Sequence, residues 1–96
     1  VPVLPVADTL ARGSERLDEI VDRRAVLRVQ TPQAFHVEDL AFAFSETRGR
    51  PATDESSVLL AAGLKVAVVD GAPELEKLTA PGDWARAEAM LAATFV

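Results

Sequence analysis

The change from strand to helix is clearest in residues 26–44, which read VLRVQTPQAFHVEDLAFAF. The first five residues are a short β-prone run, and Pro32 ends it because proline cannot donate a ladder hydrogen bond. From Val37 onward the apolar residues recur at i, i+3, i+4 and i+7, which is the spacing of an amphipathic helix. The expected buried stripe consists of Val37, Leu40, Ala41 and Phe44. A strand followed directly by a helix indicates an α/β or α+β fold.

The residues after this segment predict a second, shorter helix. Gly49 and Pro51 end the first helix, Asp54 is placed to cap the second one, and Gly63 suits its C-terminal end. The side chains that this short helix is expected to bury are Val58, Leu59 and Ala62.

A strand and a last helix are expected beyond Gly63. Residues 64–69 are almost continuously apolar and β-branched, which is typical of a strand covered on both faces. Residues 70–73 then predict a turn, and Pro81 suits the first turn of the last helix. The buried face of that helix is expected to comprise Trp84, Ala87 and Leu91.

The N-terminal quarter predicts two short strands and a turn. Residues 1–10 are apolar and β-prone, but Pro2 and Pro5 remove two ladder donors, which predicts an edge strand or an irregular segment. A polar turn at 12–16 separates this run from a second strand candidate at 17–22. The two runs can form a hairpin, and an isolated hairpin is marginal in water, so it needs another surface to lie against.

Length, charge and composition limit the kind of protein. The chain has 96 residues, enough for one domain or part of one. Its net charge of -5 argues against nucleic acid or an anionic membrane as the main partner, because both require a basic face. It has no cysteine, which excludes a disulfide scaffold and a thiolate metal site and fits a cytoplasmic location. No run of 18 apolar residues occurs, so no membrane span is expected.

Few side chains in this sequence can carry chemistry. His36 is the single histidine, which rules out a two-histidine metal motif, and its place at a helix start predicts a surface residue. The sequence has no Gly-rich phosphate loop and no nucleophile elbow. What remains are hydroxyls and cations at breaks between the expected elements, namely Thr9, Arg23, Thr31, Thr53, Lys77 and Thr79. Such groups bind phosphate, but they also serve as helix caps and solvated surface groups, so spacing alone leaves both interpretations open.

Five segments occur together in an order that resembles one enzyme family. They are Pro5-Val6-Ala7-Asp8-Thr9, Val21-Asp22-Arg23, Gln30-Thr31-Pro32-Gln33-Ala34-Phe35, Ala52-Thr53-Asp54-Glu55-Ser56-Ser57 and Lys77-Leu78-Thr79-Ala80-Pro81-Gly82-Asp83. Taken together they resemble the C-terminal part of 2-C-methyl-D-erythritol 4-phosphate cytidylyltransferase, over about residues 5–91. This family transfers CMP from CTP to its substrate's phosphate and releases pyrophosphate, in non-mevalonate isoprenoid biosynthesis.

The resemblance implies a fold and a set of site residues. The fold would be α/β, the C-terminal portion of a Rossmann-like nucleotidyltransferase sheet with a protruding β-hairpin dimerisation arm. Arg23 and Lys77 would be the catalytic residues, which position the substrate phosphate. The substrate-binding residues would be Thr9, Arg23, Thr31, Thr53 and Lys77, while Thr79 would support the turn that holds Lys77.

The resemblance also implies partners outside these residues. Residues 1–96 would be the C-terminal part of one cytidylyltransferase domain, with the arm at about 5–25 and a substrate-binding part at about 26–96. The N-terminal half, which would bind CTP and a divalent metal such as magnesium, lies outside this sequence, and no metal ligand is expected within it. Two subunits would form a homodimer through the arm, which would place residues such as Thr9, Arg23 and Thr31 in the partner's active site. A fusion to a cyclodiphosphate synthase domain is compatible with the sequence.

Two positions depart from the family pattern, and other functions stay open. Leu75 stands where Asn is frequent and Gly82 where Glu is common, but the expected role of Lys77 does not depend on either. A cytidylyltransferase for another polyol phosphate, such as ribitol 5-phosphate, and a non-catalytic dimerisation module would both be compatible with these residues. The chain alone is expected to be inactive, because it has no group that grips a triphosphate, and to expose the sheet edge where the other half belongs.

Overall fold

The computed structural model describes residues 1–94, and it contains two small sheets and three α-helices within them. One sheet has the strand order β4-β1-β5, and the other is the hairpin of β2 and β3. The strands are β1 (Pro2–Pro5), β2 (Leu10–Gly13), β3 (Leu17–Val21), β4 (Leu27–Val29) and β5 (Val69–Asp70). The helices are α1 (Val37–Glu46), α2 (Glu55–Ala61) and α3 (Pro81–Thr94), with a 3₁₀ turn, η1 (Pro73–Leu75), before α3. The last two residues of the predicted substrate-binding part, 26–96, lie outside the described residues.

β1 is the central strand of the first sheet, so the prediction of an edge strand over residues 1–10 is wrong. It pairs antiparallel with β4 and parallel with β5. Pro2 and Pro5 are its first and last residues, where a missing N–H disturbs the ladder least. The carbonyl of Pro2 still takes part, because it accepts a hydrogen bond from the N–H of Gln30 at 2.9 Å. The chain then leaves this sheet, and only from Leu10 does it enter the hairpin.

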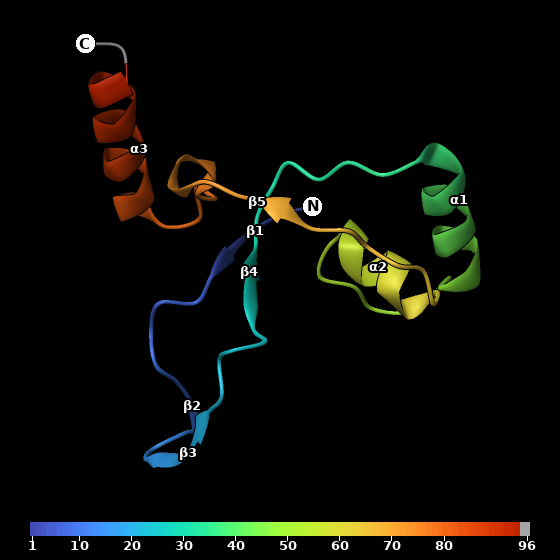
Figure 1. Cartoon of the computed structure of the whole chain (residues 1–96), viewed down its shortest axis with the longest axis horizontal. Coiled ribbons are helices and arrows are strands. Elements are labelled where there is room, and N and C mark those ends of the chain that lie inside the picture. The colour runs from blue at the N-terminus through green and yellow to red at the C-terminus, as the bar shows by residue number, and fades with distance from the viewer. Residues whose placement is uncertain (95–96) are drawn as a thin grey trace.

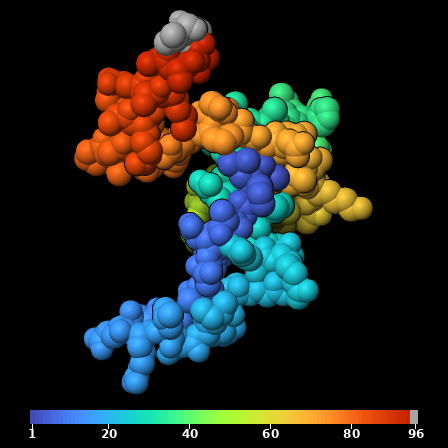
Figure 2. Space-filling view, turned by 60° about the vertical axis from the view of Figure 1, so that its left-hand side comes forward, coloured from blue at the N-terminus to red at the C-terminus, as the bar shows by residue number. Residues whose placement is uncertain are grey.

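The hairpin of β2 and β3 projects from one end of the molecule, and α3 from the other (Figures 1 and 2). Its strands pair antiparallel with Leu10 opposite Val21, and the register shifts between Arg12 and Gly13. Every residue from 11 to 20 is exposed, including Ile20 at 61%. The hairpin therefore has no apolar core of its own within residues 1–94, and its part in dimerisation stays a prediction.

The buried core lies between α1 and α2. Its buried apolar residues are Ala43, Val58 and Leu59, and those packed partly buried against them are Phe35, Leu40, Ala62, Leu64 and Val66. The prediction for the second helix is confirmed for Val58 and Leu59, while Ala62 is half-buried. The buried residues of this core come from α1 and α2, so the core stabilises the packing of these two helices.

The predicted buried stripe of α1 is wrong in register. Val37 and Phe44 are 78% and 51% exposed, whereas Ala43 is fully buried and Thr47, just after the helix, is 7% exposed. The face that meets α2 is instead built on Leu40, Ala43 and Thr47, at i, i+3 and i+7, where the small Ala43 allows close approach of the two helices.

Two further elements predicted to be buried are largely exposed within residues 1–94, although Leu64 and Val66 are half-buried against the core. Of the strand predicted at 64–69 only Val69 pairs, in β5, and it is 61% exposed because β5 is the edge of its sheet. In α3, Trp84 and Leu91 are 61% and 58% exposed, and Ala87 is half-buried. Figure 1 shows the reason, since α3 extends away from the sheet and from the α1–α2 pair.

The described chain is more extended than a compact domain of its length. Its radius of gyration is 16.7 Å, whereas a compact domain of this length would have about 12–13 Å. No helix among residues 1–94 has the length and apolar character needed to cross a membrane.

Candidate functional site

Two of the predicted site residues, Thr31 and Lys77, line one cleft of about 120 Å³. Thr31 comes after β4 and Lys77 after η1, so the cleft forms where these two segments meet. Arg28 and Glu76 also line it, and Glu76 is paired with Arg86 at 2.9 Å. The cleft thus combines a hydroxyl, an ammonium and a guanidinium group, which are the donors that bind a phosphate.

Gln30 also lines this cleft, and it is only 8% exposed. Its Nε2 donates to the carbonyl of Ala72 at 2.8 Å, and its Oε1 accepts from the N–H of Ala72 at 3.1 Å. The buried amide therefore joins the end of β4 to the segment that leads from β5 to Lys77. Gln30 belongs to the motif quoted for the resemblance, yet the sequence interpretation gave it no role.

Thr53 lies outside this cleft, in a hydrogen-bonded cluster around Asp54 at the start of α2. Its Oγ1 is 2.7 Å from Oγ of Ser57, and Asp54 accepts from the N–H of Ser57 at 2.9 Å, which confirms the predicted cap. Gln33 donates from Nε2 to Asp54 at 2.9 Å and to the carbonyl of Gln30 at 3.3 Å, which links the cluster to the cleft. The amide of Gln33 and the N–H of Ser57 hold the pKa of Asp54 well below its usual range.

Thr9 and Arg23 lie at the base of the hairpin, and neither lines the cleft. Nη1 of Arg23 donates to the carbonyl of Ala7, two residues before Thr9. The adjacent Arg24 is held by Asp22, with Nη2 2.6 Å from Oδ2, and this contact lowers the pKa of Asp22. Thr9 and Arg23 thus lie outside the cleft that Thr31 and Lys77 share.

Thr79 lies at the start of α3 and helps to fix it. Its N–H and hydroxyl donate to Oδ2 of Asp83 at 3.0 and 3.1 Å, and the N–H of Ala80 donates to the same oxygen at 2.9 Å. Asp83, at the third helical position, reaches back to the free N–H groups as the acidic residue of a capping box does. This geometry suits a residue that supports the turn holding Lys77, and that role stays a prediction.

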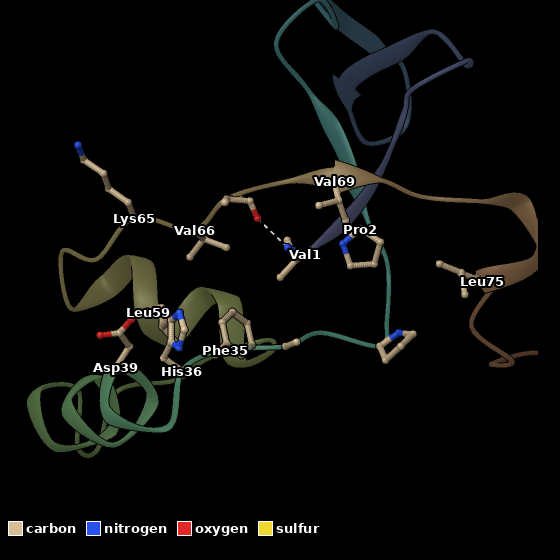
Figure 3. Close-up of a pocket in the computed structure, with 13 residues that line it drawn as sticks. Val1, Pro2, Phe35, His36, Asp39, Leu59, Lys65, Val66, Val69 and Leu75 are labelled. Atoms are coloured by element: carbon tan, nitrogen blue, oxygen red, sulfur yellow. Dashed lines mark hydrogen bonds between the residues drawn. The ribbon is translucent and has the colours of Figure 1, made fainter.

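A larger hollow of about 600 Å³ lies elsewhere, between β5 and the α1–α2 pair (Figure 3). Phe35, Leu59 and Val66 line it, so it continues the apolar core, and it contains none of the six predicted site residues. Figure 3 shows the Lys65 side chain pointing away from these three. His36, at the start of α1, is exposed on its rim, as predicted for a surface residue. The hollow is therefore an uncovered part of the core and not a polar site.

Residues 1–94 contain no group of three or more His, Asp or Glu side chains that could hold a metal ion. By themselves, these residues do not fit the divalent metal that the resemblance implies.

Comparisons with known proteins identify the family. The family model for IspD, 2-C-methyl-D-erythritol 4-phosphate cytidylyltransferase, matches residues 1–93. A bifunctional enzyme IspD/IspF of Rhizorhabdus wittichii is 47% identical over 93 residues, 96% of this chain and 24% of the relative. The 2-C-methyl-D-erythritol 4-phosphate cytidylyltransferase of Cereibacter sphaeroides is 46% identical over 92 residues, 95% of this chain and 40% of that protein.

A solved structure supports the same assignment. The crystal structure of 2-C-methyl-D-erythritol 4-phosphate cytidylyltransferase from Thermus thermophilus superposes with a TM-score of 0.83 at 40% identity. The match covers 93% of this chain and 45% of that chain, so the present residues span less than half the length of these relatives. The chain belongs to the 2-C-methyl-D-erythritol 4-phosphate cytidylyltransferase family.

Proposed function

We propose that this chain supplies the polyol-phosphate side of an enzyme that transfers CMP from CTP to 2-C-methyl-D-erythritol 4-phosphate. The observation that carries the proposal is the cleft of Thr31 and Lys77, in a chain of this family. In the reaction a phosphate oxygen of the polyol substrate attacks the α-phosphorus of CTP. The bond from that phosphorus to the bridging oxygen breaks, and pyrophosphate leaves with the bonding electrons.

The residues of the cleft would hold the attacking phosphate. Lys77 supplies a point charge and Thr31 a hydroxyl donor, and neither group has to form a covalent bond with the substrate. Reactions of this kind depend on alignment of the reacting atoms and on stabilisation of developing charge. Arg28, which the sequence interpretation missed because it lies within β4, would add a second cation to the same cleft.

Thr9, Arg23 and Thr53 would complete the substrate site in the assembled enzyme. Thr9 and Arg23 stand at the hairpin, so the proposal places them in the site of the partner subunit of a homodimer. CTP and the divalent metal, magnesium, would be bound by residues outside this chain, and the chain alone would be inactive. The bifunctional relative of Rhizorhabdus wittichii supports the further expectation of a fusion to a cyclodiphosphate synthase domain, and we expect a cytoplasmic enzyme.

The test is pyrophosphate release by the full-length product of the gene that encodes this chain, with CTP and magnesium. 2-C-methyl-D-erythritol 4-phosphate and ribitol 5-phosphate are offered separately. Turnover with the first alone is expected, and Lys77→Ala should lower kcat/KM by about 100-fold or more, as loss of a charge-stabilising donor does. Lys65→Ala is the matched control, because Lys65 is exposed and lies outside the cleft, and it should stay within about twofold of the wild type.

The other outcomes assign different functions. Turnover with ribitol 5-phosphate alone would make the protein a cytidylyltransferase for that polyol phosphate. No turnover with either would favour a non-catalytic dimerisation module.

A further inference from the structure

The cleft of Thr31 and Lys77 is formed by two segments that are far apart in the chain and are joined by one buried side chain. Gln30 directly precedes Thr31, and it binds both backbone groups of Ala72, which lies 42 residues later. The two contacts imitate a narrow pair of strand hydrogen bonds at a place where no strand continues. A glutamine amide is suited to this, since it carries a donor and an acceptor side by side.

Gly71 supplies the space that this contact requires. A Cβ built at Gly71 would lie 2.1 Å from Oε1 of Gln30 and 2.8 Å from the carbonyl oxygen of Val3. The N–H of Gly71 also donates to Val3 at 2.8 Å, which holds the segment against β1. Any larger residue at this position must displace either the glutamine amide or the central strand.

We propose that Gln30 is a positioning residue, which with Gly71 sets the distance between the Thr31 hydroxyl and the Lys77 ammonium. Gln30 lines the cleft, but both polar atoms of its amide are bonded to Ala72, so the amide is not available to hold the substrate. Between Ala72 and Lys77 the chain has only η1 and one further residue, so a shift at Ala72 is transmitted to Lys77. The inference has two halves. The structural half, that Gln30 holds the segment that carries Lys77, does not depend on the proposed function. The kinetic half, that this placement affects turnover, rests on it.

The structural half is tested by amide hydrogen exchange in the full-length gene product. Gln30→Met keeps the volume and removes both hydrogen bonds to Ala72. We expect exchange in residues 72–78 to become about tenfold faster or more, the factor that corresponds to the loss of two such bonds, while residues 58–62 of α2 stay unchanged. Leu60→Met is the matched control, because it places the same side chain at an exposed position of α2. Unchanged exchange over 72–78 in Gln30→Met would overturn the inference.

The kinetic half is tested by a double-mutant cycle with Lys77→Ala. In the wild-type background, Gln30→Met is expected to lower kcat/KM for the polyol phosphate by about 10- to 100-fold, as small misplacements of a positioning group do. The KM for CTP should stay within about twofold. In the Lys77→Ala background the same change should cost no more than about twofold, because the group that it positions is gone. Gly71→Ala should reproduce Gln30→Met in both backgrounds.

Each outcome separates the inference from the proposed function. Equal losses in both backgrounds would show a general fold defect and overturn the positioning role. A wild-type protein that turns over neither polyol phosphate would overturn the proposed function, and the exchange experiment would still decide whether Gln30 holds the segment that carries Lys77.

Discussion

Asp54 is a residue on which local and long-range structure both depend. It caps α2 through the N–H of Ser57, and it also receives the amide of Gln33 from 21 residues earlier in the chain. Both donors stabilise the ionised carboxylate, so they lower the pKa of Asp54, and burial opposes them only in part. The charge of this carboxylate therefore contributes to the stability of the fold.

We expect Asp54→Asn to lower the free energy of unfolding of the full-length product by about 1 kcal/mol at pH 7, because asparagine can still cap α2 but loses the charge and one of the two acceptor oxygens. A carboxyl whose pKa is lowered by folding stabilises the protein above its unfolded pKa of about 4, and this contribution is lost as the pH falls through the folded pKa. The difference in the free energy of unfolding between wild type and Asp54→Asn should therefore become smaller below about pH 4.

Urea titrations at pH 7 and pH 3 measure that difference. Glu46→Gln, at an exposed position in the last turn of α1, is the control and should change the free energy of unfolding by no more than about 0.5 kcal/mol at either pH. If the difference for Asp54→Asn is the same at both pH values, the charge of Asp54 does not stabilise the fold as inferred.

The sequence predicted residue-level features where both partners are close in the chain. The cap of Asp54 was predictable because its acceptor and the N–H of Ser57 are three positions apart. The contacts of Gln30 with Ala72 and of Gln33 with Asp54 were not, because a separation of 42 or 21 residues leaves no periodic signal. The sequence interpretation named Thr31 and Lys77 through the resemblance, and only the fold shows that they share a cleft.

At the scale of elements, the end of α2 illustrates how a glycine fixes a boundary. Gly63 has φ +83°, and its N–H donates to the carbonyl of Leu60 while the N–H of Leu64 donates to that of Leu59. These two bonds form the Schellman motif, with Leu64 packed against the core that contains Leu59. The motif turns the chain from α2 toward the segment that becomes β5.

Gly63→Ala should lower the free energy of unfolding by about 1 kcal/mol, because a residue with a Cβ is strained at this φ. The strain is purely local, since no atom lies within 4 Å of the added Cβ. Gly82→Ala, within α3, is the matched comparison, because its Cβ would only approach Nη1 of Arg86 at 3.7 Å. It should stabilise the protein by about 0.4–1 kcal/mol. Chemical denaturation of the two variants measures the change in the free energy of unfolding of each. A change of the same sign in both variants would contradict the role of Gly63 at the end of α2.

The existence of the helices was predictable, but the faces that they bury were not. Capping residues, glycines and prolines mark the end of α1, both ends of α2 and the start of α3, because these signals act within a turn of the helix. The buried face depends on what lies opposite, and here α2 meets Ala43 instead of Phe44. Trp84 of α3 is exposed because nothing within residues 1–94 covers it.

At the scale of the whole molecule, several exposed apolar residues lie on parts that project or end a sheet. Ile20 in the hairpin, Val69 at the edge of β5 and Trp84 on α3 are each 61% exposed. Together with the radius of gyration of 16.7 Å, this distribution describes a chain whose apolar surfaces call for contacts beyond its own residues. The matched relatives are more than twice as long, which offers such contacts within one subunit, but the hairpin extends away from the sheet.

The hairpin is therefore expected to be covered by a second subunit. Burial of an Ile side chain contributes about 1.5–3 kcal/mol, so Ile20→Asp in the full-length product should weaken a dimer about tenfold or more. Sedimentation equilibrium of both proteins measures the change. Val37→Asp is the control, because Val37 is an exposed apolar residue in the first turn of α1, where an acidic side chain favours the helix dipole. A dimer as tight in Ile20→Asp as in the wild type would remove the hairpin from the interface. It would also remove the reason to place Thr9 and Arg23 in the partner's site, since the hairpin alone would bring them there.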